Sequence, residues 1–390
     1  MKTGLLDPPT LTGRSNGIDF LRGWFSIQVL VLGHVAFWAV FAQGRAAVPS
    51  AVKGLASALV WLFQSRAELN PAVLGFIVLS GFCIHRNGLR PGSPIQPFAI
   101  RRAFRILPVF GLATFAGIAL FGLSAQISPS LASALTGTTE IPAACVIAKI
   151  TAVASLWPIA YPCDFAGNAP LLTVMVEIGL YAFYGAIFAF GGEIWVLCAC
   201  AASVLVGLVV AALNIRHPSL YNWWQNSSLL AFLPYWWIGA AAIVPRYRLA
   251  LLKHWPAMAA AWLALTLIAY FLDPTAMASE LRKLVLAGLM ACMIVKFDDM
   301  AMPANPLSFV GKAGYSVYAF HAPLAVYLLL MGASWWQASA GAIVFGVGAY
   351  FAFERPLNLA GRHIARAAKP SLALEGHRIG AAPEAATPPP

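Results

Sequence analysis

Long apolar stretches separated by short polar ones make up most of this chain. About ten of the apolar runs are long enough to cross roughly 30 Å of hydrocarbon at about 1.5 Å per helical residue. They lie near residues 18–42, 70–86, 104–124, 169–190, 194–213, 228–245, 255–272, 283–297, 313–332 and 336–354. The pattern therefore predicts an all-α polytopic membrane protein, a bundle of about ten transmembrane helices.

The polar segments divide the chain into three parts. Residues 1–17 are predicted to be a cytoplasmic N-terminal segment without a signal peptide, and residues 18–366 an integral membrane domain. Residues 367–390 are rich in Ala, Pro and Gly, which predicts a disordered cytoplasmic tail. The apolar region 141–160 contains Pro and Lys and is interpreted as interfacial or re-entrant rather than as a further span.

Cys145 and Cys163 fall in a segment that the predicted topology places outside the cell. In an oxidising compartment they would form one disulfide, and otherwise they would stay free. The sequence leaves both alternatives open.

Composition supports the membrane class, because 60% of the residues are hydrophobic, only 10% are charged and the mean hydropathy is +0.76. The net charge of +11 would suit a nucleic-acid partner in a soluble protein. In a membrane protein the position of the 25 Lys and Arg residues matters more, and most of them lie in loops on one side of the predicted bundle. The positive-inside rule then predicts both termini in the cytoplasm, and no nucleic acid is expected as a partner.

Polar residues at membrane depth mark the first candidate site. His34, Glu177 and His321 lie at depths that would let all three reach one central cavity, and Arg22 precedes His34 in the first span. A histidine oriented by a second polar group can accept a proton from a hydroxyl. The alternative is that these residues only form hydrogen bonds between packed helices.

A second candidate site is the basic run at residues 98–108, where Arg102 and Arg105 lie on one helical face beside Arg101. Paired guanidinium groups bind phosphate or carboxylate, although the same arginines would also anchor a helix to lipid headgroups. Arg86 is close enough to join them. Ser80 and Gly81 interrupt the preceding apolar helix, which permits either close helix packing or local unwinding.

Six short blocks occur in the order typical of one known family, and together they extend from about residue 17 to 366. They are IDFLRG at 18–23 followed by His34, FIVLSGF at 76–82, RRAFRILP at 101–108, LTVMVEIGLYAFY at 172–184, YSVYAFHAP at 315–323 and FERP at 353–356. The chain resembles the membrane-bound acyltransferase family 3, which contains bacterial O-acyltransferases of surface and exported glycans. We interpret the FERP corner as structural.

The resemblance implies an enzyme of the bacterial inner membrane that moves an acyl group, usually acetyl, from cytoplasmic acyl-CoA to a glycan hydroxyl. The acceptor would be a polysaccharide, a lipopolysaccharide or a lipid-linked oligosaccharide, with no permanently bound cofactor and no metal. It further implies that Arg22 and His34 are essential. Arg102 and Arg105 would hold the CoA phosphates with help from Arg101, Arg86 and Ser80, while His34 acts as base or acyl relay, oriented by Glu177 or His321.

The sequence departs from the family pattern in two places. Eleven residues separate Arg22 from His34 where the family usually has ten, which rotates one of them about 100° further round an ideal helix. Either a π-type bulge, eased by Gly23 or Gly33, restores the register, or one assignment is wrong. In addition, Leu172 stands at a position where the family usually has Trp.

Two other classes of function remain open on the sequence. In a proton-coupled secondary transporter or glycan flippase, the intramembrane His and Glu would form a proton relay. In a binding subunit without catalytic activity, the altered register would have moved His34 out of its functional position.

Overall fold

The computed structural model describes residues 5–6, 15–63, 70–89, 93–136 and 168–368, and within them every regular element is a helix. The α-helices are α1 (Asn16–Ile27), α2 (Ala36–Gln43), α3 (Ser50–Phe63), α4 (Pro71–Arg86), α5 (Gln96–Ile127), α6 (Pro129–Thr136), α9 (Leu171–Phe190), α10 (Glu193–Ala212), α11 (Pro218–Ser227), α12 (Leu229–Ala241), α13 (Pro245–Phe271), α14 (Met277–Asp299), α15 (Pro306–Lys312), α16 (Gly314–Leu330), α17 (Trp335–Ala349) and α18 (Arg355–Ala367). Two π-helices, η1 (Gln28–Val35) and η3 (Tyr350–Glu354), and a 3₁₀ turn, η2 (Arg45–Ala47), complete the described elements.

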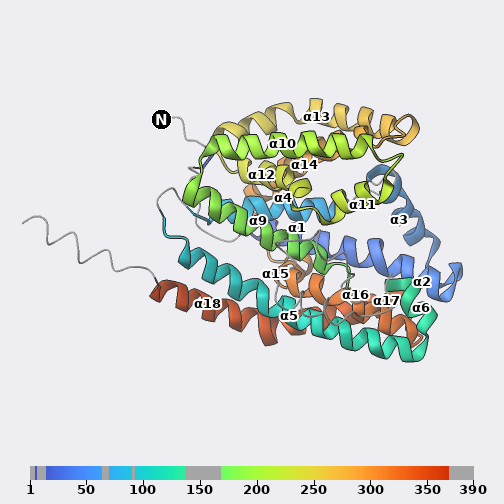
Figure 1. The fold of residues 1–390 in the computed structure, drawn as a ribbon. Coiled ribbons are helices and arrows are strands. Elements are labelled where there is room, and N and C mark those ends of the chain that lie inside the picture. Colours follow the sequence, from blue (N-terminus) through green and yellow to red (C-terminus); the bar gives the residue numbers. More distant parts are fainter. Residues whose placement is uncertain (1–4, 7–14, 64–69, 90–92, 137–167, 369–390) are drawn as a thin grey trace, which may run out of the picture.

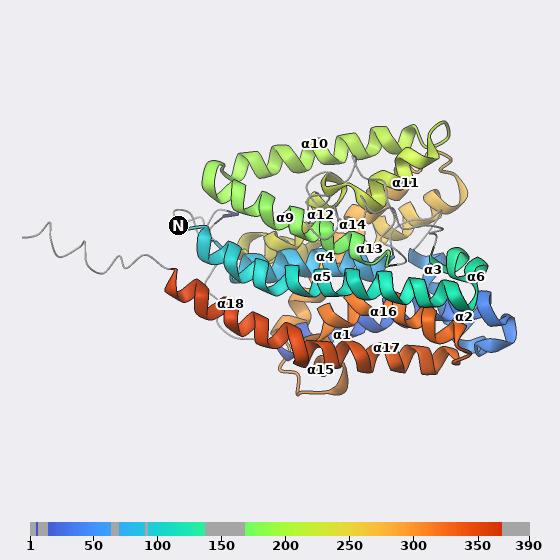
Figure 2. The same cartoon turned by 60° about the horizontal axis from the view of Figure 1, so that its bottom comes forward.

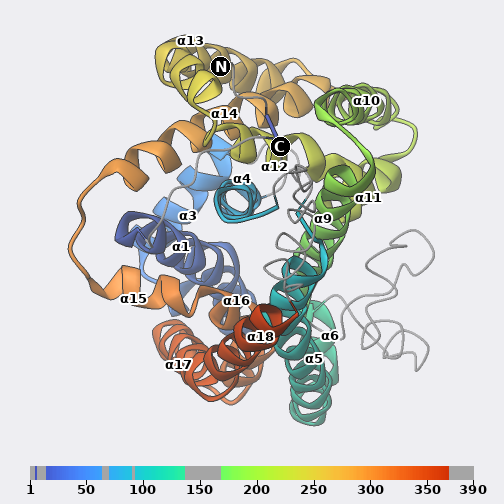
Figure 3. The same cartoon turned by 90° about the vertical axis from the view of Figure 1, so that its left-hand side faces the viewer.

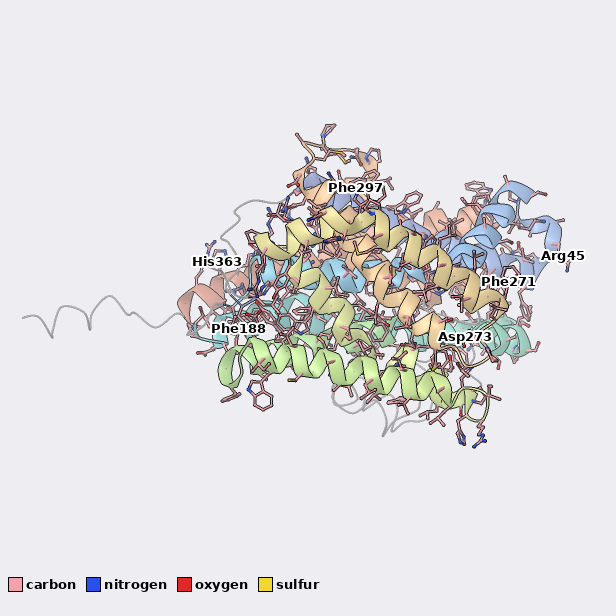
Figure 4. The ribbon with its side chains drawn as sticks, turned by 90° about the horizontal axis from the view of Figure 1, so that it is seen from above. Arg45, Phe188, Phe271, Asp273, Phe297 and His363 are labelled. Atoms are coloured by element: carbon pink, nitrogen blue, oxygen red, sulfur yellow. The ribbon has the colours of Figure 1, made fainter. Side chains whose placement is uncertain are left out.

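The long helices lie side by side along one common direction (Figure 1). Phe188 and His363 mark one end of this bundle, here called the α18 end, and Arg45 and Phe271 mark the other, here called the α2 end (Figure 4). Seen from the α18 end, α4 occupies the centre, with α1, α9 and α12 around it (Figure 3). The central position of α4 lets one cavity follow it along the bundle.

Six described helices are long and apolar enough to cross a membrane, and a seventh is gained if α15 and α16, bent by 84°, are one span. The all-helical, multi-pass prediction is confirmed, whereas the count of ten is not. All ten predicted ranges are helices, but α4 has 16 residues, α12 has 13, and α14 carries Glu280, Arg282 and Lys283 within it. The cytoplasmic placement of both termini stays a prediction.

Glycines let the central helices approach very closely. A Cβ at Gly81 of α4 would lie 1.9 Å from the backbone oxygen of Trp236 in α12, and a Cβ at Gly239 of α12 would lie 1.9 Å from that of Val78. Since α4 is one continuous helix, the Ser80–Gly81 pair serves close packing and not unwinding. This contact fixes the position of α4 and so of Ser80, which it carries.

The first helix is locked in the same way. A Cβ at Gly17 would lie 1.9 Å from the backbone oxygen of Phe297, and one at Gly23 would lie 1.9 Å from that of Leu307. The side chain of Ser15 caps the start of α1 by accepting a hydrogen bond from the backbone N–H of Ile18. These contacts hold Arg22 at a fixed height in the bundle.

Three predictions fall wholly or almost wholly on parts of the chain outside the described residues. They are the re-entrant character of region 141–160, the Cys145–Cys163 disulfide and the disordered tail at residues 367–390. All three stay predictions.

Candidate functional site

A cavity of about 710 Å³ runs between α1, α4, α5, α9, α16 and α18. It brings together Arg22, Ser80, Arg86, Arg101, Arg102, Arg105 and Glu177, which come from four separate helices. Seven of the nine site residues chosen from the sequence therefore line one space. The other two, His34 and His321, lie outside its lining.

The α18 half of the cavity is strongly basic. The cavity is lined by the five predicted arginines and by three further basic residues, Lys312, Arg355 and Arg362. Against these eight basic residues, the described lining contains two carboxylates, Glu177 and Glu354. The guanidinium of Arg22 donates to Asp19 at 3.0 Å and to the Sγ of Cys83 at 3.1 Å, and that of Arg86 pairs with Asp298. The remaining six basic groups make no ion pair within the described part of the chain, which suits a ligand with several negative charges.

Arg102 is held by aromatic rings. Its guanidinium carbon lies 5.5 Å from the ring centre of Phe98 and 5.7 Å from that of Tyr181. Its buried Nε has no hydrogen-bond partner in the described residues. A buried donor without a partner is costly, and an anion in the cavity would supply the missing acceptor.

Glu177 lies midway along the cavity. Its Oε1 accepts hydrogen bonds from the hydroxyl of Ser80, at 2.7 Å, and from that of Tyr181. Trp236 donates in turn to the oxygen of Ser80 at 3.4 Å. The carboxylate is thus oriented by hydroxyls and, within the described part of the chain, makes no hydrogen bond with either histidine.

Beyond Glu177 the cavity becomes apolar. Val73, Phe76, Ile77 and Val174 form its walls, and Thr173 and Tyr318 stand at its end. The hydroxyls of Thr173 and Tyr318 are hydrogen-bonded at 2.6 Å, and the ring of Phe76 packs edge-on against Tyr318 with centres 5.6 Å apart. Neither His34 nor His321 is among the described residues that line this cavity, so the lining brings Glu177 together with the arginines and not with the two histidines.

His34 and His321 form a hydrogen-bonded pair behind Tyr318. The Nδ1 of His321 lies 2.8 Å from the backbone oxygen of Tyr318, and its Nε2 lies 2.8 Å from the Nδ1 of His34. Since a carbonyl oxygen only accepts, the Nδ1 of His321 carries a proton, and in a neutral ring its Nε2 is then an acceptor. His34 must therefore donate from Nδ1, which leaves its Nε2 with a free lone pair.

The ring of His34 is further oriented by stacking on Trp38, with centres 4.8 Å apart and planes 6° from parallel. His34 is half-buried, whereas His321 is buried. One ring of the pair is accessible and the other serves as its support. Of the two predicted orienting residues, the structure places His321 and not Glu177 against His34.

The predicted π-type bulge is present. The π-helix η1 covers residues Gln28–Val35 between α1 and α2 and contains both Gly33 and His34. A π turn takes up one extra residue, which compensates for the eleven residues between Arg22 and His34. Gly33 has a local reason as well, because a Cβ there would lie 2.7 Å from the Nδ2 of Asn70 at the start of α4.

Some residues have a place that the sequence analysis did not give them. Buried Glu354, interpreted above as structural, lines the cavity and accepts hydrogen bonds from the backbone N–H and the hydroxyl of Ser316, at 3.2 and 2.6 Å. Arg355 and Arg362 are spaced by seven residues and so share one face of a helix, a signal that could have found them.

The family comparison favours one of the classes of function left open above. Residues 15–353 match the family described as "Acyltransferase domain", so the match covers nearly the whole chain. The chain belongs to this family. The chain is thus a membrane acyl-transfer enzyme by family. Comparisons with curated proteins and with solved structures gave no match.

Proposed function

We propose that the acyltransferase moves a short neutral acyl group, acetyl, from acyl-CoA to a hydroxyl of a surface or exported glycan. The observation that carries this proposal is one continuous cavity that is basic at the α18 end and apolar at the end that adjoins the histidine pair. A donor with a polyanionic head and a neutral reactive end matches that gradient of polarity.

The basic half suits the phosphates of coenzyme A. Arg102 and Arg105 project from one face of α5, and Arg101 lines the same half of the cavity. Arg86 and Ser80 line the wall that the pantetheine arm would follow along α4. Arg22, paired with Asp19, contributes positive charge near the same wall and helps to hold the donor.

The apolar half suits an acetyl group better than a succinyl group. A carboxylate among Val73, Phe76, Ile77 and Val174 would lose its hydration without gaining a cationic partner there. The Thr173–Tyr318 contact must open for the thioester to reach His34, because the cavity ends at these two hydroxyls.

In the transfer step the acceptor oxygen attacks the thioester carbonyl carbon while the Nε2 of His34 takes the hydroxyl proton. The carbon–sulfur bond breaks, and coenzyme A leaves as its thiolate. His321 is a positioning residue that accepts from the Nδ1–H of His34 and holds the tautomer required. Glu177 acts on the donor side, through Ser80 and Tyr181.

Because acyl-CoA is made in the cytoplasm, this proposal orients the α18 end and both termini toward the cytoplasm of a bacterial inner membrane. His34 then lies toward the outer side, where exported or lipid-linked glycans are found. The positive-inside distribution of the sequence supports the same orientation.

The test is the O-acetyl content, by proton NMR, of surface and exported glycan from a deletion strain. The strain is complemented with the wild-type chain, with His34→Ala or with His363→Ala, a matched control on the exposed side of α18. Acetyl signals with the wild type and the control, and none with His34→Ala at equal membrane abundance, are expected. Equal acetylation by all three would contradict the role of His34, and unchanged spectra without the gene would contradict the glycan acceptor.

A further inference from the structure

One wall of the cavity comes from α18, which follows the last span. Arg355, Asn358, Leu359 and Arg362 line the cavity, and their spacing places them on one face of this helix. The family match ends at residue 353, so this wall lies beyond it.

The helix α18 is packed tightly against α5. A Cβ at Gly361 would lie 2.5 Å from the Cβ of Phe104, so the two backbones approach as closely as only glycine permits. Figure 2 shows α18 running alongside α5 toward the α18 end of the bundle. This contact fixes the arginines of α18 relative to those of α5.

The two helices bring like charges together. Arg101 of α5 and Arg362 of α18 are close enough to repel each other, and neither makes an ion pair within the described part of the chain. Such a pair of guanidinium groups is unfavourable without a ligand, and a bound anion between them would relieve the repulsion.

Coenzyme A carries its negative charge in two separate groups, a diphosphate and a 3′-phosphate monoester. Arg102 and Arg105, one turn apart on α5, match the first. We propose that Arg362, with Arg101, forms a second anion subsite that binds the phosphate monoester of the donor nucleotide. This inference rests on the proposed use of acyl-CoA.

The test compares coenzyme A with 3′-dephospho-coenzyme A, which lacks only the monoester. Affinities of both are measured by isothermal titration calorimetry on the full-length acyltransferase in nanodiscs, as wild type, Arg362→Ala and Arg366→Ala. Arg366 is the matched control, since it lies one turn further along α18, is also exposed and does not line the cavity.

The wild type is expected to bind coenzyme A at least tenfold more tightly than the dephospho form, about 1.4 kcal/mol. Arg362→Ala should remove most of that preference and leave the affinity for the dephospho form unchanged, which also shows that the variant is folded. Arg366→Ala should behave as the wild type, and Arg362→Lys should keep part of the preference.

Two results would overturn the inference while leaving the proposed donor in place. They are a wild type that binds both ligands equally, and an Arg362→Ala variant that loses the same factor for both. Repeating the titrations in nanodiscs with and without anionic lipid separates a third case, in which Arg362 binds a lipid phosphate and alters only the lipid dependence. If neither ligand binds to the wild type, the proposed function itself fails.

Discussion

The hydrogen bond between His34 and His321 predicts that substitutions of the two residues are not additive. His34→Ala removes the proposed base, and a positioned general base typically contributes about 10²–10⁴ in rate. His321→Ala keeps the base but removes the acceptor of its Nδ1–H, which lies 2.8 Å away. The first variant therefore tests the proposed base, and the second tests the residue that orients it.

The magnitude for His321→Ala follows from the bond that it removes. A neutral hydrogen bond contributes about 0.5–1.5 kcal/mol net, and 1.36 kcal/mol corresponds to a tenfold change in rate. The expected loss in kcat is therefore roughly 2- to 13-fold, well below that of His34→Ala. The double variant should be no slower than His34→Ala alone, because His321 then has no ring to orient.

The assay is the initial rate of transfer of radiolabelled acetyl from acetyl-CoA to glycan in isolated membranes, normalised to the amount of acyltransferase. His363→Ala serves as the control and should keep the wild-type rate. A double variant whose loss is the product of the two single losses would show that His321 acts independently of His34. A His321→Ala loss as large as that of His34→Ala would assign His321 a share in proton transfer, contrary to the orienting role.

Three further predictions concern the donor, the acyl group and the packing of the bundle. Arg102→Ala should raise the KM for acetyl-CoA about tenfold or more with a smaller change in the KM for the acceptor, because its guanidinium, whose buried Nε has no partner in the described residues, would contact a phosphate. Equal changes in both KM values would indicate a structural role. Succinyl-CoA should give less than about a tenth of the transfer rate of acetyl-CoA, since the apolar end of the cavity offers its carboxylate no cation; comparable rates would contradict the assignment of that end to the acyl group. Gly81→Ala should lower the free energy of unfolding in detergent by about 1–3 kcal/mol, seen as a lower Tm, because its Cβ would overlap the backbone of α12. Gly54→Ala is the control and should not lower the Tm, because the space around Gly54 is open. An unchanged Tm for Gly81→Ala would contradict the close α4–α12 contact.

Hydrophobic patterning predicted where the helices lie, but not which of them can cross a membrane unaided. The 13 residues of α12 and the charged positions of α14 are tolerated because both helices are packed within the bundle. Glu280 and Lys283 form an ion pair with each other inside α14, and both are buried. The two residues are three positions apart, so helical spacing predicts that they pair. Their burial depends on the helices packed around α14, and a count of apolar residues along the chain does not detect it.

The candidate site, too, was predicted from the sequence only in part. The predicted donor residues share one cavity because helical spacing and helix direction determine which residues share a face and a depth. The choice between Glu177 and His321 as the partner of His34 depended on side-chain contacts through Ser80, Tyr181 and Tyr318, which spacing does not reveal. The place of α18 in the cavity wall was missed because Arg355 and Arg362 also fit a plain positive-inside anchor.

The π-helix η1 has a consequence for how such chains can vary. Glycine contacts fix α1 on one side of the wide turn, and the bond to His321 fixes His34 within it. An extra residue between these anchors changes the winding of the helix and leaves Arg22 and His34 where they are. Insertions and deletions of one residue in the segment 28–33 should therefore be tolerated among relatives, and a chain with ten residues between the Arg and the His should have a plain α-helix there.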